Sequence, residues 1–220
     1  MDLFTIIEYD KALLLALNGS NSAFLDHVVL VFTSGLTWIP MYISLLYLVV
    51  KNNEKCMLLS NGINGGLVKP LVGRLRPSFD PSLADSISLV NGYTAEGFSF
   101  FSAHSCNAFT VAVFFVLLVR SRVLSTFLFV WAITVAWTRL YLGVHFPTDV
   151  LVGTLAGITI ASLCYFGYSK ITRRVAPISP YVTDQYTPTG YSLKDIDVVL
   201  ATIVLTCIYC VVRGVIEAGL

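Results

Sequence analysis

The sequence predicts an all-α fold: a polytopic membrane bundle of five to six transmembrane helices, preceded by an N-terminal interfacial helix. Of the 220 residues, 56% are hydrophobic and only 12% are charged, whereas a soluble domain carries about 25% charged residues. The mean hydropathy is +0.78. Apolar segments that approach the ~20 residues of a membrane-spanning helix recur along the whole chain. The net charge is only +1 and no basic face stands out, which argues against a nucleic-acid partner. We expect the bilayer as the partner.

The first 20 residues differ from the spans that follow. Asp2, Glu8, Asp10 and Lys11 interrupt their apolar residues, which recur at roughly helical spacing. The basic start of a cleavable signal peptide is missing. A helix of this composition suits the membrane surface, so we expect an amphipathic helix that lies in the interface.

The remaining chain divides into apolar spans and two longer polar stretches. The first span contains Gly35 and Pro40, so we expect it to tilt or kink. Residues 73–101 are predicted to form an outer loop and residues 173–194 a cytoplasmic loop, within one integral-membrane domain over residues 1–220. The predicted spans are residues 22–50, 56–72, 102–119, 123–140 and 148–168, with 196–212 as a sixth and last helix.

Basic residues in the connections predict the orientation. If the connection after the first span is cytoplasmic, alternation of the spans places most basic residues on the same side, as the positive-inside rule requires. These residues are Lys51, Lys55, Arg120, Arg122, Lys170, Arg173, Arg174 and Lys194. The opposite face receives Lys69, Arg74, Arg76, Arg139 and Arg213.

Alternation also brings three polar clusters to that outer face. They are "KPLVGRLRP" at residues 69–77, "FFSAHSCNAF" at 100–109 and "TRLYLGVHFPTDV" at 138–150. Lysine and arginine side chains suit phosphate oxygens, and the start of the helix at Ser102 and Ala103 adds backbone N–H donors. We therefore expect an anion in this site. No cluster of carboxylates or thiolates suits a metal, so we expect neither a metal nor another cofactor.

The third cluster contains the residues for phosphoryl transfer. His145 and Asp149 are four apart, and Pro147 is a natural first residue of a helix. The carboxylate then reaches one imidazole nitrogen and leaves the other free as a nucleophile. His104 is the natural general acid for the leaving oxygen, while the fixed cations stabilise charge on the phosphate. This arrangement predicts a two-step transfer through a phosphohistidine.

Each residue also has a simpler interpretation. Lys69 and Arg76 could be interfacial anchors, the histidines structural hydrogen-bonding groups, and Arg139 the ion-pair partner of Asp149. The arrival of all three clusters at one face favours the catalytic interpretation. Arg74 and Asn107 are possible further site residues.

The order Lys-x6-Arg-Pro, Ser-x-His and Arg-x5-His-x3-Asp resembles the signature of the type 2 phosphatidic acid phosphatase superfamily. That family includes membrane lipid phosphatases, bacterial acid phosphatases and vanadium haloperoxidases. The resemblance covers a core at residues 56–168 and implies that His145 is the nucleophile, oriented by Asp149, with His104 as the proton donor. It implies that the phosphate ligands are Lys69, Arg76, Ser102, the Ala103 backbone and Arg139.

The resemblance has departures in two motifs. Phe101 and Ala103 stand where the family usually has proline and glycine, and Thr138 replaces a serine. Alanine still offers its backbone N–H, although a conformation with positive φ would be costly. These changes affect loop geometry more than the identity of the catalytic groups.

A cationic site at the surface of a bilayer, in a chain without a soluble domain, implies a lipid substrate. We expect a metal-independent bacterial lipid phosphatase in the inner membrane, with its site facing the periplasm. The resemblance implies lipid A or undecaprenyl diphosphate as leading substrates, and phosphatidylglycerol phosphate or phosphatidic acid as further ones. Alternatives are a lipid phosphotransferase that uses the same phosphohistidine and, more distantly, a non-enzymatic transporter, although we find none of the internal repeats common in transporters.

Overall fold

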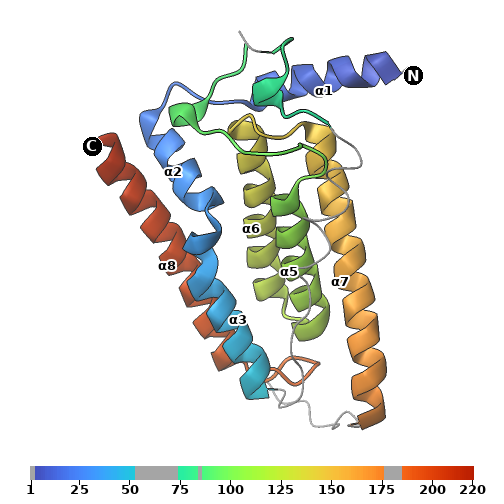
Figure 1. Ribbon diagram of the computed structural model, residues 1–220. Coiled ribbons are helices and arrows are strands. Elements are labelled where there is room, and N and C mark those ends of the chain that lie inside the picture. The colour runs from blue at the N-terminus through green and yellow to red at the C-terminus, as the bar shows by residue number, and fades with distance from the viewer. Residues whose placement is uncertain (1–2, 53–73, 84–85, 176–184) are drawn as a thin grey trace.

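The computed structural model describes residues 3–52, 74–83, 86–175 and 185–220, and this part of the chain is a helical bundle (Figure 1). Helices α5, α6 and α7 pack together, and α8 packs along α2 and α3. The helices are α1 (Leu3–Leu17), α2 (Ala23–Thr33), α3 (Ile39–Asn52), α5 (Ala103–Val119), α6 (Arg122–Tyr141), α7 (Pro147–Val175) and α8 (Leu193–Ala218). Short 3-10 turns lie at Gly35–Trp38, Pro77–Phe79 and Val90–Gly92.

The helices confirm the predicted membrane bundle. Among the described residues, α6, α7 and α8 are long and apolar enough to cross a bilayer, and α2 with α3 forms a bent pair that passes the same test. Helix α5 is apolar but has only 17 residues. The predicted span 56–72 lies outside the described residues. Helix α7 continues into the predicted cytoplasmic loop, and α8 begins before and ends beyond the predicted last helix. The chain is therefore an integral membrane protein.

The predicted kink in the first span is confirmed. Helices α2 and α3 meet at 65° around the turn that begins at Gly35. Carbonyl groups released by the break are satisfied by side chains: Thr37 Oγ1 donates to Val31 O at 2.7 Å, and Trp38 Nε1 donates to Phe32 O at 2.8 Å. Because backbone groups inside a bilayer need such partners, these contacts let the chain bend within a membrane span.

Two glycines on α7 allow close packing against α5. A Cβ at Gly153 would lie 2.5 Å from Ser102 O, and one at Gly157 would lie 2.4 Å from Cys106 O. Their spacing is the small-xxx-small pattern that brings membrane helices into contact. Thr110 Oγ1 also donates to Gly157 O at 3.3 Å. This packing places the N-terminal ends of α5 and α7 together, at the end of the bundle nearest α1 (Figure 1).

The predicted N-terminal helix is present as α1, which lies across this same end of the bundle (Figure 1). Leu14 is buried in a small apolar cluster with Leu83 and Phe146. Other side chains of α1 are exposed on the surface of the protein: Phe4 is 73% exposed and Tyr9 is 66% exposed. A helix that is docked on one side and apolar on its exposed side suits the membrane surface.

The opposite end of the bundle carries several of the basic residues that predicted the orientation. Lys51, at the end of α3, donates to Asp195 Oδ1 in the first turn of α8 at 2.7 Å. Arg120 and Arg122 lie where α5 turns into α6, and Lys194 lies at the start of α8. In Figure 1 the end of α3 and the starts of α6 and α8 lie at the opposite end of the bundle from α1.

Candidate active site

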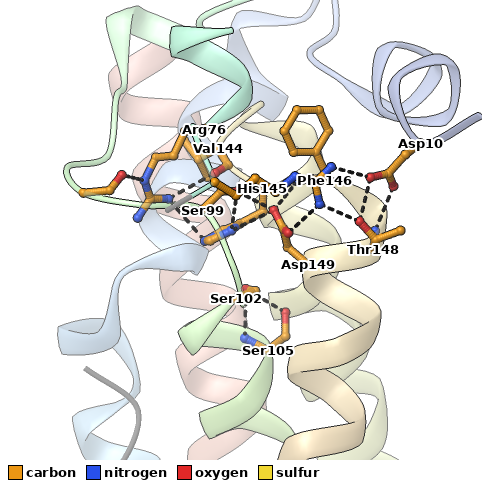
Figure 2. A network of polar contacts seen from close by, with 12 residues as sticks. Asp10, Arg76, Ser99, Ser102, Ser105, Val144, His145, Phe146, Thr148 and Asp149 are labelled. Carbon is orange, nitrogen blue, oxygen red and sulfur yellow. Dashed lines mark hydrogen bonds and ion pairs between the residues drawn. The ribbon is translucent and has the colours of Figure 1, made fainter. Parts of the chain in front are cut away.

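His145 occupies the short connection between α6 and α7, where the outer loop and the start of α5 also meet (Figure 2). Its side chain is only 2% exposed. The neighbouring Arg76, Ser99 and Asp149 are equally well buried. Three segments far apart in the sequence thus surround one imidazole with a cation, a hydroxyl and a carboxylate.

Arg76 is held against the imidazole by backbone carbonyls. Its Nη1 donates to Val144 O at 3.0 Å, while Nε donates to Gly97 O at 3.0 Å and Nη2 to Glu96 O at 2.9 Å. The same Nη1 lies 3.3 Å from His145 Nε2. Since a guanidinium only donates, Nε2 is the accepting nitrogen and the proton of the neutral ring lies on Nδ1.

The Asp149 carboxylate is fixed on the other side of the ring. Oδ2 accepts from Phe146 N at 3.0 Å and from Ser99 Oγ, and it lies 3.7 Å from His145 Nδ1. Oδ1 accepts from Arg74 Nη1 at 2.8 Å. Asp149 is the third residue of α7, and Phe146 directly precedes this helix. The hydrogen bond from Phe146 N to the Asp149 side chain is therefore one of the two bonds of a capping box. The helix start itself therefore sets the position of the carboxylate.

Burial controls the charge of His145. It lowers the pKa of the imidazole to about 4, against the opposing effect of the Asp149 carboxylate and with further lowering by Arg139 and Arg76. At neutral pH the ring is therefore uncharged. A neutral imidazole whose Nε2 lone pair lies beside a cation is suited to attack an anionic phosphate that the same cation binds.

Helix α5 begins at this site with Ser102 as its N-cap. Ser102 Oγ accepts from Ser105 N at 3.4 Å and Ser105 Oγ at 3.0 Å (Figure 2). The Ser102 N–H donates to Asp149 O at 3.1 Å, which joins the starts of α5 and α7. Ala103 and the half-buried His104 follow in the first turn, at the positive end of the helix dipole.

Arg139 contributes a second buried guanidinium. It lies in the last turn of α6, is 1% exposed, and donates from Nη1 to Thr33 Oγ1 at 2.7 Å. Its Cζ lies 5.8 Å from the centre of the Tyr93 ring. Within the described part of the chain, Arg139 Nε is buried without a hydrogen-bond partner. A buried unpaired donor on a cation calls for an explanation, and an anionic ligand supplies one.

The structure brings several of the predicted site residues together. Arg76, His145 and Asp149 are in contact, and Ser102 is joined to them through its backbone. Asn107 is exposed on α5, and Lys69 lies outside the described residues. Ser102 was predicted as a phosphate ligand. In the structure its hydroxyl also caps the start of α5.

One alternative for an arginine needs correction, and a second arginine has partners that the sequence did not indicate. The alternative in which Arg139 pairs with Asp149 is wrong, because Asp149 pairs with Arg74 and Arg139 binds Thr33. Arg74, considered as a possible phosphate contact, directs its guanidinium to the carboxylates of Asp149 and Asp10. It places a positive charge beside Asp149.

Four residues of this network were not predicted. Thr33, Tyr93 and Ser99 are ordinary polar residues in a span or a loop, and nothing in their local sequence marks them. Asp10 does carry a signal, since it is an acidic residue in an apolar helix. Its partners, however, lie 64 and 138 positions further along the chain.

Comparison with known proteins finds several relatives. A "Lipid A 4'-phosphatase" of Bacteroides thetaiotaomicron is 34% identical over 96% of this chain and 97% of its own length. A protein of the same name from Porphyromonas gingivalis is 29% identical over 74% of each chain. An Escherichia coli protein whose name proposes undecaprenyl-diphosphatase activity is 48% identical over 27% of this chain and 30% of its own.

No solved structure matches the chain. The profile of the PAP2 superfamily matches residues 55–173, which include all three motifs. The profile covers more than half of the chain, and the Bacteroides thetaiotaomicron relative aligns with nearly all of it. The chain therefore belongs to the PAP2 superfamily.

Proposed function

We propose that this protein is a membrane-integral lipid phosphatase that removes the 4′-phosphate of lipid A. The observation that carries the proposal is the buried contact of His145 Nε2 with Arg76, opposite the Asp149 carboxylate. Beside it lies a second buried arginine, Arg139, whose Nε has no partner among the described residues. The choice of lipid A rests on the two relatives that bear this name and align with most of the chain.

In the first step, the Nε2 lone pair of His145 attacks phosphorus while the bond from phosphorus to the sugar oxygen breaks. His104 gives a proton to the departing oxygen, so the lipid leaves as an alcohol. The Arg76 and Arg139 guanidinium groups bind the non-bridging oxygens, with Lys69 in the role that the family resemblance implies. Asp149 stabilises the positive charge that develops on the imidazole as the phosphorus–nitrogen bond forms.

In the second step, water attacks the phosphohistidine. His104, now neutral, takes a proton from that water, and the phosphorus–nitrogen bond breaks to release inorganic phosphate and neutral His145. The arginine side chains supply the electrostatic stabilisation that metal ions supply in kinases. Among the described residues, no group of three His, Cys, Asp or Glu side chains could hold a metal ion. Because these fixed cations supply that stabilisation, we propose metal-independent hydrolysis.

The proposed orientation places this site at the periplasmic face of the inner membrane. Its support is the set of basic residues at the other end of the bundle, which includes Lys51, Arg120 and Lys194. Connections rich in lysine and arginine stay in the cytoplasm. In this orientation, the phosphate of an outer-leaflet lipid reaches the site while its acyl chains remain in the bilayer.

A second candidate substrate is undecaprenyl diphosphate. The short, 48% identical match to the Escherichia coli protein favours it. The cluster of arginines recognises phosphate in either lipid, so the difference between the two substrates depends on contacts outside that cluster. The phosphotransferase alternative uses the same first step but discharges the phosphohistidine onto a lipid hydroxyl.

The test is phosphate release by purified protein in detergent with EDTA present. Lipid A, undecaprenyl diphosphate, phosphatidylglycerol phosphate and phosphatidic acid are compared at equal surface concentration. The variants are His145→Ala and, as a matched control, His27→Ala, which removes a histidine that pairs with Glu217 on α8. We expect release from lipid A by the wild type and by His27→Ala, and none by His145→Ala.

Each other result overturns a stated part of the proposal. Release from undecaprenyl diphosphate alone replaces the substrate. Loss of activity in EDTA overturns metal independence. Phosphate that moves to an added lipid acceptor without free phosphate identifies a phosphotransferase. Equal release by wild type and His145→Ala removes His145 from the mechanism. A function that survives the His145→Ala substitution, in a protein that releases no phosphate, favours the transporter.

A further inference from the structure

Asp10 is a buried carboxylate that the proposed chemistry does not use. It lies in α1 and is 5% exposed. Oδ1 accepts from Thr148 N at 2.8 Å, while Oδ2 accepts from Thr148 Oγ1 at 2.6 Å and from Arg74 Nη2 at 2.8 Å (Figure 2 shows its contacts with Thr148). A buried carboxylate requires such partners, and all of them belong to the immediate surroundings of Asp149.

Arg74 connects Asp10 to Asp149. Its Nη2 binds Asp10, and its Nη1 binds Asp149 Oδ1 at 2.8 Å and Thr148 Oγ1 at 2.8 Å. The guanidinium lies over the Phe146 ring, with Cζ 4.0 Å from the ring centre. One planar cation is thus held by two carboxylates and a ring, which fixes both the direction and the distance from which it contacts Asp149.

Asp10 also holds the first turn of α7. Thr148 is the second residue of this helix, so its N–H has no acceptor within the helix. Asp10 satisfies this N–H from another helix and adds a negative charge at the positive end of α7. Since Asp149 is the next residue, the turn that Asp10 holds is the turn that directs the Asp149 carboxylate toward His145.

We propose that Asp10 is a positioning residue, through which docking of α1 completes the active site. This inference rests on the proposed phosphatase function. Asp10 touches no reacting atom; it sets the orientation of Arg74 and of the first turn of α7, and through them the orientation of Asp149 against His145 Nδ1. The apolar contact of Leu14 with Leu83 and Phe146 keeps α1 at the distance that these hydrogen bonds require.

Asp10→Asn tests this arrangement directly. The amide keeps an oxygen for Thr148 N but presents an NH₂ group to the Arg74 guanidinium, so Arg74 loses one of its two carboxylates. We expect kcat on lipid A to fall about tenfold, because a small misplacement of a catalytic group slows the chemical step. KM should change less than twofold. Removal of a nearby negative charge also favours neutral His145, so the acidic limb of the kcat/KM profile moves to lower pH.

The matched control is Glu8→Gln, which removes one negative charge from an exposed position of the same helix. Phosphate release from lipid A is measured in detergent between pH 3.5 and 9, with thermal unfolding of each variant. We expect wild-type kcat and an unshifted profile for Glu8→Gln. Asp10→Glu keeps the charge and both oxygens, so we expect at least half of the wild-type kcat.

A double variant separates positioning from a general loss of stability. Because Asp10→Asn keeps an acceptor for Thr148 N, its effect should run through Arg74. Adding Asp10→Asn to Arg74→Gln should then lower kcat no further than Arg74→Gln alone, and losses that multiply would overturn the inference. Wild-type kcat and an unshifted profile in Asp10→Asn, or an equal shift in Glu8→Gln, also overturn it. Absence of phosphate release by the wild type overturns the proposed function itself, which distinguishes the two failures.

Discussion

Ser99 Oγ donates a hydrogen bond to Asp149 Oδ2, and both residues are fully buried. The same hydroxyl lies 3.4 Å from His145 Nδ1. Because the Asp149 oxygen is 3.7 Å from this nitrogen, Ser99 contributes to the contact between Asp149 and His145. The orientation of His145 thus depends on a residue of the outer loop as well as on the start of α7.

Replacement of this hydroxyl tests its contribution. We expect Ser99→Ala to lower kcat by about three- to tenfold and to cost about 1–2 kcal/mol of unfolding free energy, because Asp149 Oδ2 loses a buried donor. Phosphate release and thermal unfolding measure the two effects. Ser86→Ala removes an exposed hydroxyl of the same loop and should change neither. Equal kcat for both variants would show that Ser99 does not orient the pair.

The pH dependence follows from the charge of His145. Attack requires the neutral imidazole, and burial lowers its pKa to about 4. Because the pKa is lowered, the neutral form persists to lower pH than in a free histidine, and the acidic limb of kcat/KM should lie near pH 4. Donation by His104 requires its protonated form, which makes the profile bell-shaped. Half-loss of kcat/KM already near pH 6.5 would contradict the pKa, and a flat profile would contradict both assignments.

Neutralising Asp149 should slow the first chemical step. Asp149→Asn keeps the size of the side chain but removes the charge that stabilises the imidazolium and pairs with Arg74. We expect a loss of at least about 100-fold in single-turnover cleavage of lipid A, with the fold retained. Asp197→Asn changes an exposed acid on α8 and serves as the control. An unchanged cleavage rate in Asp149→Asn would remove Asp149 from the mechanism.

The packing of α5 on α7 is testable with two glycines of one helix. A Cβ at Gly153 would lie 2.5 Å from the Ser102 carbonyl, whereas one at Gly167 would have nothing within 4 Å. We expect Gly153→Ala to lower the unfolding free energy by about 1–3 kcal/mol and to reduce kcat, since it displaces the start of α5. Gly167→Ala should be neutral or slightly stabilising. Thermal unfolding and phosphate release are measured for both variants. Equal stability and equal kcat would show that the contact of Gly153 with the Ser102 carbonyl does not position the start of α5.

Local sequence determined the membrane spans, the kink in the first span and most of the motif residues. Hydropathy is a property of each segment, so the predicted spans agree with α6 and with the cores of α7 and α8. Alternation of spans then placed the second and third motifs at one face without any knowledge of side-chain contacts. The capped start of α7 likewise follows from Pro147 and Asp149, which act within a single turn.

Tertiary structure alone decided how the charges are shared. Arg74, Arg76 and Arg139 look alike in the sequence. Yet Arg74 binds two carboxylates and Arg76 lies against His145, while Arg139 binds Thr33 and keeps one donor without a partner in the described part of the chain. Asp10 meets Thr148 across 138 positions. Hydropathy and motif spacing describe neighbours along the chain, whereas these contacts depend on how closely helices pack and on which groups burial brings within hydrogen-bond distance. That distance is set by three-dimensional packing, and no local pattern contains it.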